Sequence, residues 1–109
     1  MANIFKNAIL SGVGLTAANV YIAPTGNTSI CIELDVANTT SSTVSANVII
    51  RKGTGGGSAF IIKSAPIPTG SSLQVIAGQK IVLESGDYLQ VQSDTAASID
   101  AVASILQDV

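Results

Sequence analysis

Hydrophobic and polar residues alternate along most of this chain, and the alternation is clearest over residues 29–36. One set of alternate positions is apolar and the other is mostly polar: Ile30, Ile32, Leu34 and Val36 against Ser29, Cys31, Glu33 and Asp35. Because successive side chains of a strand point to opposite faces of a sheet, this segment is predicted to be a half-buried strand. Residues 43–51 repeat the pattern, and the side chains predicted to face inward are Val44, Ala46, Val48 and Ile50.

Turns rich in glycine, proline, asparagine and serine separate the further predicted strands. These strands cover residues 13–22, 59–63, 73–76, 80–84, 88–93 and 98–107. About eight short strands at a spacing of roughly 8–12 residues are typical of an antiparallel β-sandwich, either jelly-roll or Ig-like. We therefore predict an all-β fold, with residues 13–109 as a single sandwich domain and residues 1–12 as an N-terminal arm.

Both ends of the chain also fit the spacing of a helix. Near the start, Ile4, Phe5, Ala8 and Ile9 recur at helical intervals, and we favour an extended arm or a single turn there. Residues 98–107 show the same ambiguity at the other end. We favour a strand for that segment, because strands precede it and several of its residues are poor helix formers.

Several of the predicted strands are apolar on both faces, although a lone sandwich covers only one face of each strand. Local packing beneath a loop or terminal arm is one explanation. We favour the other, a subunit interface in a homo-oligomer, because large exposed apolar patches are rare on soluble monomers. The candidate interface residues are Ile4, Phe5, Ile9, Ile61, Val82, Val102 and Leu106.

The charge content narrows the classes of partner. Only 11% of the residues are charged, 47% are hydrophobic, and the net charge is −2. The five cations are scattered apart from one adjacent pair: Lys6, Arg51, Lys52, Lys63 and Lys80. A nucleic-acid binder concentrates such residues on one face, so we expect no nucleic-acid partner. The sequence contains neither a secretory signal pattern nor an apolar run of membrane-helix length, so we expect a soluble protein with no membrane partner.

The residues that usually carry catalysis are scarce. There is no histidine, so Cys31 and the serines lack the usual general base. By strand parity Cys31 shares a face with Glu33 and Asp35, whose charge would raise the thiol pKa and leave it an idle or interface residue. The two carboxylates alone supply too few oxygens for calcium. We expect neither an enzyme nor a bound metal or cofactor.

A glycine-rich stretch at residues 53–57 lacks the Gly-Lys-Ser/Thr ending of a phosphate-binding loop. It is better interpreted as a flexible hairpin tip, with a role as a docking loop. The candidate docking residues are Arg51, Lys52, Gly55, Gly56 and Gly57.

An ordered series of motifs runs through nearly the whole chain. The motifs are residues 1–8 (MANIFKNA), 20–26 (VYIAPTG), 36–40 (VANTT), 65–73 (APIPTGSSL), 79–84 (QKIVLE), 86–87 (GD) and 91–93 (VQS). This series resembles a family of small virion structural proteins of tailed bacteriophages, especially aquatic ones. Its motifs are turns and strands rather than sites, so they bear on the fold and the setting.

The resemblance implies a β-sandwich that is made in the host cytoplasm and resides on the virion. It favours a capsid decoration or cement protein that binds and stabilises the outer shell as a homo-oligomer, with a trimer favoured. The implied partners are further copies of the chain and the major capsid protein or other virion proteins. A tail, neck, fibre or adaptor component is the alternative. A receptor- or glycan-binding module is less favoured, because sugars stack on aromatic rings and only 4% of the residues are aromatic.

Overall fold

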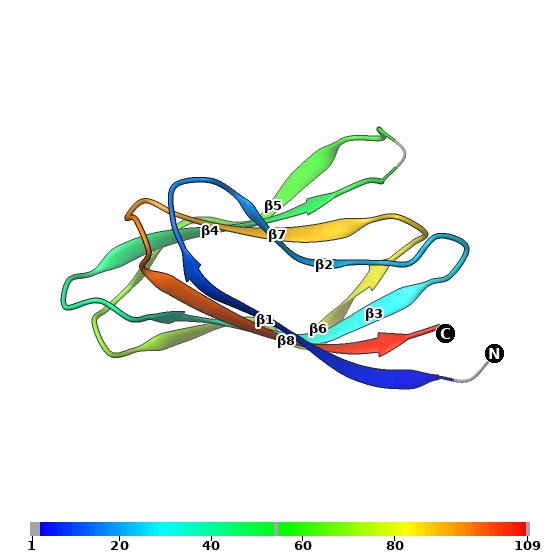
Figure 1. Ribbon diagram of the computed structural model, residues 1–109, viewed down its shortest axis with the longest axis horizontal. Helices are drawn as coiled ribbons and strands as arrows, with labels where there is room; N and C mark the ends of the chain where they lie inside the picture. Colours follow the sequence, from blue (N-terminus) through cyan, green and yellow to red (C-terminus); the bar gives the residue numbers. More distant parts are fainter. Residues whose placement is uncertain (1–2, 54, 109) are drawn as a thin grey trace.

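The computed structural model describes residues 3–53 and 55–108, which form eight β-strands in two antiparallel sheets (Figure 1). The strands are β1 (Ile4–Val13), β2 (Ala18–Ile22), β3 (Ser29–Asn38), β4 (Val44–Arg51), β5 (Ser58–Ile67), β6 (Ser72–Leu83), β7 (Tyr88–Ser93) and β8 (Ile99–Gln107). One sheet has the order β1-β8-β3-β6 and the other β2-β7-β4-β5. Eight strands divided in this way form a jelly roll, which confirms the predicted all-β sandwich.

The core lies between the two sheets and follows the predicted alternation in several strands. On β4 the side chains of Val44, Ala46 and Val48 are buried, as predicted, and Ile50 is half-buried. On β8 the alternate residues from Ile99 to Ile105 are buried, so the predicted strand is confirmed for this segment. Each fully buried Leu, Ile or Val contributes about 1.5–3 kcal/mol relative to an exposed one, and this burial stabilises the sandwich.

Strand β3 corrects the predicted division of faces at residues 29–36. Its pairing with both neighbours shifts register between Cys31 and Glu33, where an extra residue interrupts the alternation. Cys31 is therefore buried together with Leu34 and Val36, whereas Ile30 is only half-buried and lies on the outer face. Strict period two assumes an uninterrupted ladder, and a bulge reverses the assignment of every residue on one side of it.

The segment predicted as an N-terminal arm is instead largely the edge strand β1. Residues Ile4 to Leu10 pair in unbroken register with Gln107 to Ala101 of β8. Ala8 and Leu10 pack against the core, which fixes this strand to the sandwich. The helical spacing at this end is incidental: it arises because Phe5 and Ile9, which face outward, are apolar like Ile4 and Ala8 on the inner side.

Two further boundaries differ from the prediction. The predicted strand at 13–22 is the end of β1, a turn, and the short strand β2. The two predicted strands at 73–76 and 80–84 form one long strand, β6. Its interruption is a bulge in which Gly78 and Lys80 have positive φ values of 98° and 56°, so the break between the two predicted strands is a bend within one strand.

One end of the sandwich gathers several turns and strand ends. The start of β1, the end of β8, the β4–β5 hairpin and the β6–β7 turn lie at the same end of the molecule (Figure 1). Within the described part of the chain, no helix is long and apolar enough to cross a membrane.

Candidate assembly surface

Four apolar side chains form a row across the outer face of the β1-β8-β3-β6 sheet. The strand register pairs Phe5 with Leu106, Leu106 with Ile30, and Ile30 with Val82. Cross-strand partners on one face have Cβ atoms only about 4.5–5.5 Å apart, so these residues are neighbours. The row therefore crosses all four strands of this sheet.

Three more apolar side chains extend the row into a patch. Ile9 pairs with Val102 further along β1 and β8. Ile32 lies beside Phe5 in an open hollow of about 350 Å³, which is lined by Phe5, Lys6, Asn7, Ile32, Ser104 and Ile105. We call this patch the apolar face, and its residues are Phe5, Ile9, Ile30, Ile32, Val82, Val102 and Leu106. The exposed fractions are 78% for Phe5, 65% for Ile9, 58% for Val82 and 46% for Val102.

Five of the seven candidate interface residues lie on the apolar face: Phe5, Ile9, Val82, Val102 and Leu106. The other two lie elsewhere. Ile4 is exposed on β1 but has the opposite parity from Phe5, and Ile61 lies on β5 of the other sheet, half-buried against the core. Sequence reasoning missed Ile30 and Ile32, because the bulge in β3 turns them outward.

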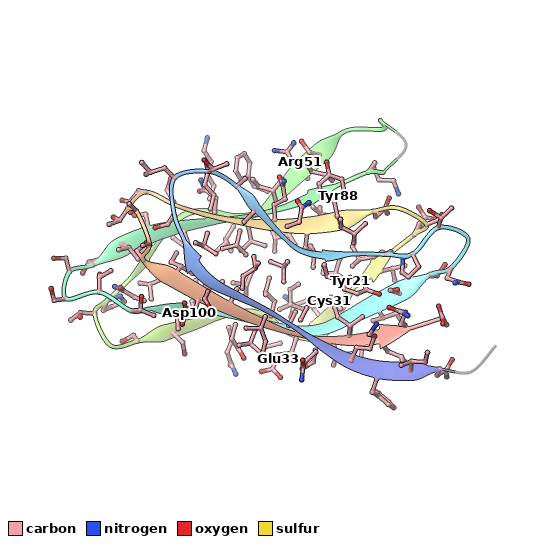
Figure 2. The ribbon with its side chains drawn as sticks, viewed as in Figure 1. Tyr21, Cys31, Glu33, Arg51, Tyr88 and Asp100 are labelled. Atoms are coloured by element: carbon pink, nitrogen blue, oxygen red, sulfur yellow. The ribbon has the colours of Figure 1, made fainter. Side chains whose placement is uncertain are left out.

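The apolar face also carries carboxylates. Glu33 lies on the outer side of the β1-β8-β3-β6 sheet, and Cys31 lies between the sheets (Figure 2). Asp35 pairs with Val102, and one oxygen of its half-buried carboxylate is buried without a hydrogen-bond partner among the described residues. The described residues contain no group of three or more His, Cys, Asp or Glu that could hold a metal ion. This surface can bury apolar area and accept a hydrogen bond.

The outer face of the β2-β7-β4-β5 sheet is built differently. Its central strands carry amide side chains that bond to one another: Gln90 donates to Asn19 at 2.9 Å, and Asn47 donates to Gln92 at 3.1 Å. Arg51 also donates to Gln90. We call this surface the amide face, and its residues are Asn19, Asn47, Arg51, Gln90 and Gln92. Among the described residues of this sheet, the large apolar side chains that are exposed are Ile22 and Phe60, and they lie on the two edge strands, β2 and β5.

The predicted docking loop is held at its base by a cluster that we call the Asp87 clamp. The buried carboxylate of Asp87 accepts hydrogen bonds from the Lys52 ammonium at 2.7 Å and from the backbone amides of Gly53 and Glu84. The Lys52 ammonium also pairs with the exposed Glu84 carboxylate at 2.7 Å. The clamp joins the β4–β5 hairpin to the β6–β7 turn, and thereby connects the two sheets.

Glycine is required where these two turns meet. A Cβ atom on Gly53 would lie 2.2 Å from the carbonyl oxygen of Gly86, so a side chain cannot fit without moving the backbone. Gly55 and Gly57 have positive φ values of 75° and 116°, which L side chains rarely adopt. Gly53, Gly55 and Gly57 therefore serve the shape of the hairpin.

The Asp87 clamp shifts the pKa values of Asp87 and Lys52. Burial alone would raise the pKa of Asp87, but the hydrogen bonds from Lys52 and the two backbone amides together hold the pKa below its usual value. The hydrogen bond to Asp87, and then the one to Glu84, raise the pKa of Lys52. The predicted docking cations are thus occupied within the chain, Lys52 by the clamp and Arg51 by Gln90.

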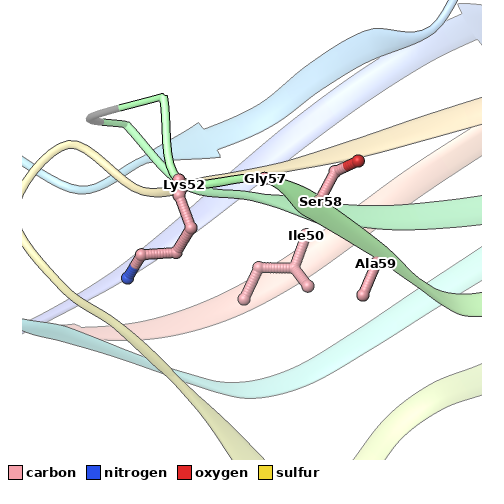
Figure 3. Close-up of a pocket in the computed structure, with 6 residues that line it drawn as sticks. Ile50, Lys52, Gly57, Ser58 and Ala59 are labelled. Carbon is pink, nitrogen blue, oxygen red and sulfur yellow. The ribbon is translucent and has the colours of Figure 1, made fainter.

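A second open hollow, of about 260 Å³, lies at the base of this loop (Figure 3). It is lined by Ile50, Lys52, Gly56, Gly57, Ser58 and Ala59. Lys52 is the charged group of this lining, and its ammonium is held by Asp87 and Glu84. The lining therefore offers small apolar surfaces rather than a cluster of reactive groups.

Cys31 is fully buried between the sheets. Burial raises the pKa of its thiol to about 11, although a hydrogen bond to the carbonyl of Glu33 partly opposes the shift. The predicted direction was right but its cause was wrong, because the carboxylates of Glu33 and Asp35 lie on the other face of the sheet. At neutral pH the thiol stays protonated and is a poor nucleophile.

Comparison with known proteins finds similarity in the fold. No protein-family model and no curated protein matches the chain. A chain of the Bacillus endospore appendages, a family of disulfide-linked pili, has a TM-score of 0.60 at 14% identity, covering 98% of this chain and 88% of that one. A chain in the structure of infectious bursal disease virus, Gx strain, has a TM-score of 0.55 at 10% identity; the match covers 97% of this chain and spans 32% of the viral chain. At such identities these likenesses show the sandwich fold alone.

Proposed function

We propose that this protein is a non-enzymatic structural component of a bacteriophage virion that docks through its apolar face. The favoured role is a capsid decoration or cement protein that binds the outer shell as a homo-oligomer. The observation that carries the proposal is the row from Phe5 to Val82, which crosses all four strands of one sheet. Its side chains are exposed at the two edge strands, at Phe5 and Val82, and half-buried on the two central strands. Such patches mark interaction sites on soluble proteins.

The free energies of burial and association favour repeated contacts through the apolar face over a single one. Burying one large apolar side chain contributes about 1.5–3 kcal/mol, so four exposed side chains contribute several kcal/mol. Association costs about 4–15 kcal/mol in lost translational and rotational freedom. One contact through the apolar face is therefore weak, and a closed ring or a shell that presents many sites would make binding stable.

The resemblance to phage virion proteins supports this setting, and the sandwich is a fold that the chain shares with a pilus chain and a virus chain. The resemblance favours three copies around a threefold point of the shell, with the major capsid protein as the partner beneath. A tail, neck, fibre or adaptor component would use the same apolar face. These locations differ in copy number.

The test is quantitative mass spectrometry of purified phage particles that encode this chain. We expect hundreds of copies per particle, as a decoration protein requires. A few copies, or about a dozen, would contradict the decoration role and indicate the neck or tail. Absence of the chain from purified particles would overturn the proposal of a virion protein altogether.

A further inference from the structure

The two sheets have four edge strands, all within the described residues, and three of them are interrupted. β2 has only five residues and a register shift between Asn19 and Tyr21. β5 contains Pro66 and a positive φ of 53° at Ser64. β6 contains the bulge at Gly78 and Lys80. Short edges, prolines and bulges are the features by which proteins prevent a further strand from pairing with an open edge.

Edge strand β1 is regular over its first seven residues, and its own interruption, with a positive φ of 64° at Gly12, lies near its end. Its residues Ile4 to Leu10 make seven consecutive register pairs with β8, and the register shifts only beyond Leu10. The side chains from Ile4 to Asn7 are exposed on both faces of the strand. One charge, on Lys6, falls within this stretch. From Ile4 to Leu10, β1 therefore presents a regular edge whose outward side pairs with no other described strand and is open to a further strand.

The sequence of this edge is complementary to itself. In an antiparallel pair of β1 strands centred on Asn7, Phe5 faces Ile9 of the partner subunit on the outer side. On the inner side, Ile4 faces Leu10 of the partner subunit, and Lys6 faces Ala8 of the partner subunit. Aromatic and β-branched residues are a favourable cross-strand pair. A pair centred on Lys6 would instead place two ammonium groups opposite each other.

We propose that β1 is a twofold edge contact, at which two copies of this chain pair their β1 strands antiparallel with Asn7 on the axis. The pair joins two β1-β8-β3-β6 sheets into one sheet of eight strands, and it makes their apolar faces continuous. This edge contact rests on the self-association in the proposed function and adds a second contact between copies of the chain. The edge contact uses β1, so most of the apolar face stays available for the shell or for a threefold contact.

The first test introduces charge on the axis. In Asn7→Lys, two ammonium groups lie opposite each other across the pair, and in Asn7→Asp two carboxylates do so. Like charges juxtaposed at an interface are strongly unfavourable, so we expect each variant alone to associate at least tenfold more weakly than wild type. An equal mixture of the two variants places opposite charges on the axis, so we expect it to recover association.

Analytical ultracentrifugation gives the readout. Loss of a twofold contact halves the copy number of the assembled species, so that a pair becomes monomers and a pair of trimers becomes trimers. If each variant alone retains the mass and affinity of the wild-type assembly, the edge contact is wrong while the proposed self-association stands. A wild-type chain that stays at 11.0 kDa at every concentration contradicts both.

A cross-link tests the register directly. Opposite Cα atoms in an antiparallel pair are about 4.5–5.5 Å apart, within the range that a disulfide spans. Asn7→Cys is therefore expected to form a covalent dimer under mild oxidation, and the buried Cys31 does not compete.

The matched control for the cross-link is Ser11→Cys, an exposed position on the same strand. In the proposed register its two copies lie roughly 27 Å apart, at about 3.4 Å per residue, so no dimer is expected. Cross-linking of the Ser11→Cys variant without cross-linking of the Asn7→Cys variant would overturn the register.

Discussion

The two outer faces of the sandwich carry opposite chemistry on the same kind of scaffold. On the β2-β7-β4-β5 sheet, amides and Arg51 bond to one another across the central strands. On the β1-β8-β3-β6 sheet, each of the four strands instead presents apolar side chains outward, beside a few polar ones. Both sheets cover the same core, so the core does not explain the difference. We attribute the difference to association: the amide face is suited to water, and the apolar face is suited to a partner.

The difference between the two faces is tested most directly by placing a charge on the apolar face. Val82→Asp puts a short carboxylate at the end of the row, where docking would bury it at a cost of several kcal/mol. We expect association to weaken at least a hundredfold, measured by sedimentation. The matched control, Asn19→Asp on the amide face, is expected to associate as wild type does. Equal effects of the two substitutions would contradict the difference between the faces.

A substitution in the Asp87 clamp separates stability from association. Asp87→Ala leaves the amides of Gly53 and Glu84 and the Lys52 ammonium without their acceptor. We expect the free energy of unfolding in urea to fall by about 1–3 kcal/mol. Glu84→Ala is the control, because the Glu84 side chain is 71% exposed, and its effect is expected to stay within about 0.5 kcal/mol. Neither variant is expected to change association through the apolar face.

The same clamp predicts a dependence of stability on pH. The pKa of Asp87 is lower in the folded chain than in the unfolded chain, where it is about 3.9. The contribution of the ionised Asp87 carboxylate to the free energy of unfolding is therefore complete above that value. It is lost as the pH falls through the lower pKa of the folded chain. Wild type is expected to lose stability below about pH 4 more steeply than Asp87→Ala. Parallel pH profiles for the two chains would contradict this role of Asp87.

A smaller effect is expected from the amide face itself. Gln90→Ala removes the hydrogen bonds with Arg51 and Asn19, whose polar groups remain accessible to water. The expected loss of stability in urea is about 0.5 kcal/mol, and the oligomeric mass is expected to stay unchanged. A loss above 1 kcal/mol, or a change in mass, would show that the amide face has a structural or binding role beyond solvation.

The smallest expected response concerns the thiol. With a pKa of about 11, about one Cys31 thiol in a thousand is ionised at pH 8, and the side chain is buried. We expect no reaction of the native chain with a water-soluble disulfide reagent, and one reactive thiol per chain after unfolding. Association through the apolar face needs no disulfide, in contrast to the disulfide-linked pili whose fold is similar. Rapid labelling of the native chain would contradict the burial of Cys31.

Local alternation was enough to predict the sandwich. The strands at residues 43–51, 88–93 and 98–107 were recognised because each buries alternate side chains without interruption across most of its length. Five residues of the apolar face were also predicted, since apolar residues on both parities of a strand exceed what one core can cover.

The features that local alternation did not predict depend on contacts between residues distant in sequence. The bulge after Cys31 arises where β3 fits between β6 and β8, and no local pattern marks it. Ile30 and Ile32 were therefore assigned to the wrong face. The sequence predicts an arm at β1 because Ile4, Phe5, Ala8 and Ile9 also fit helical spacing and show no clean alternation. The first residues of β1 are exposed on both faces, so only pairing with β8 defines them as a strand.

The central claim is that the apolar face is an association surface, and sedimentation equilibrium of the purified chain tests it most directly. The account predicts a mass that rises with concentration to a multiple of 11.0 kDa, and a fall in that mass for Val82→Asp but not for Asn19→Asp. A constant mass of 11.0 kDa from micromolar to millimolar concentration would contradict the claim of self-association through this face.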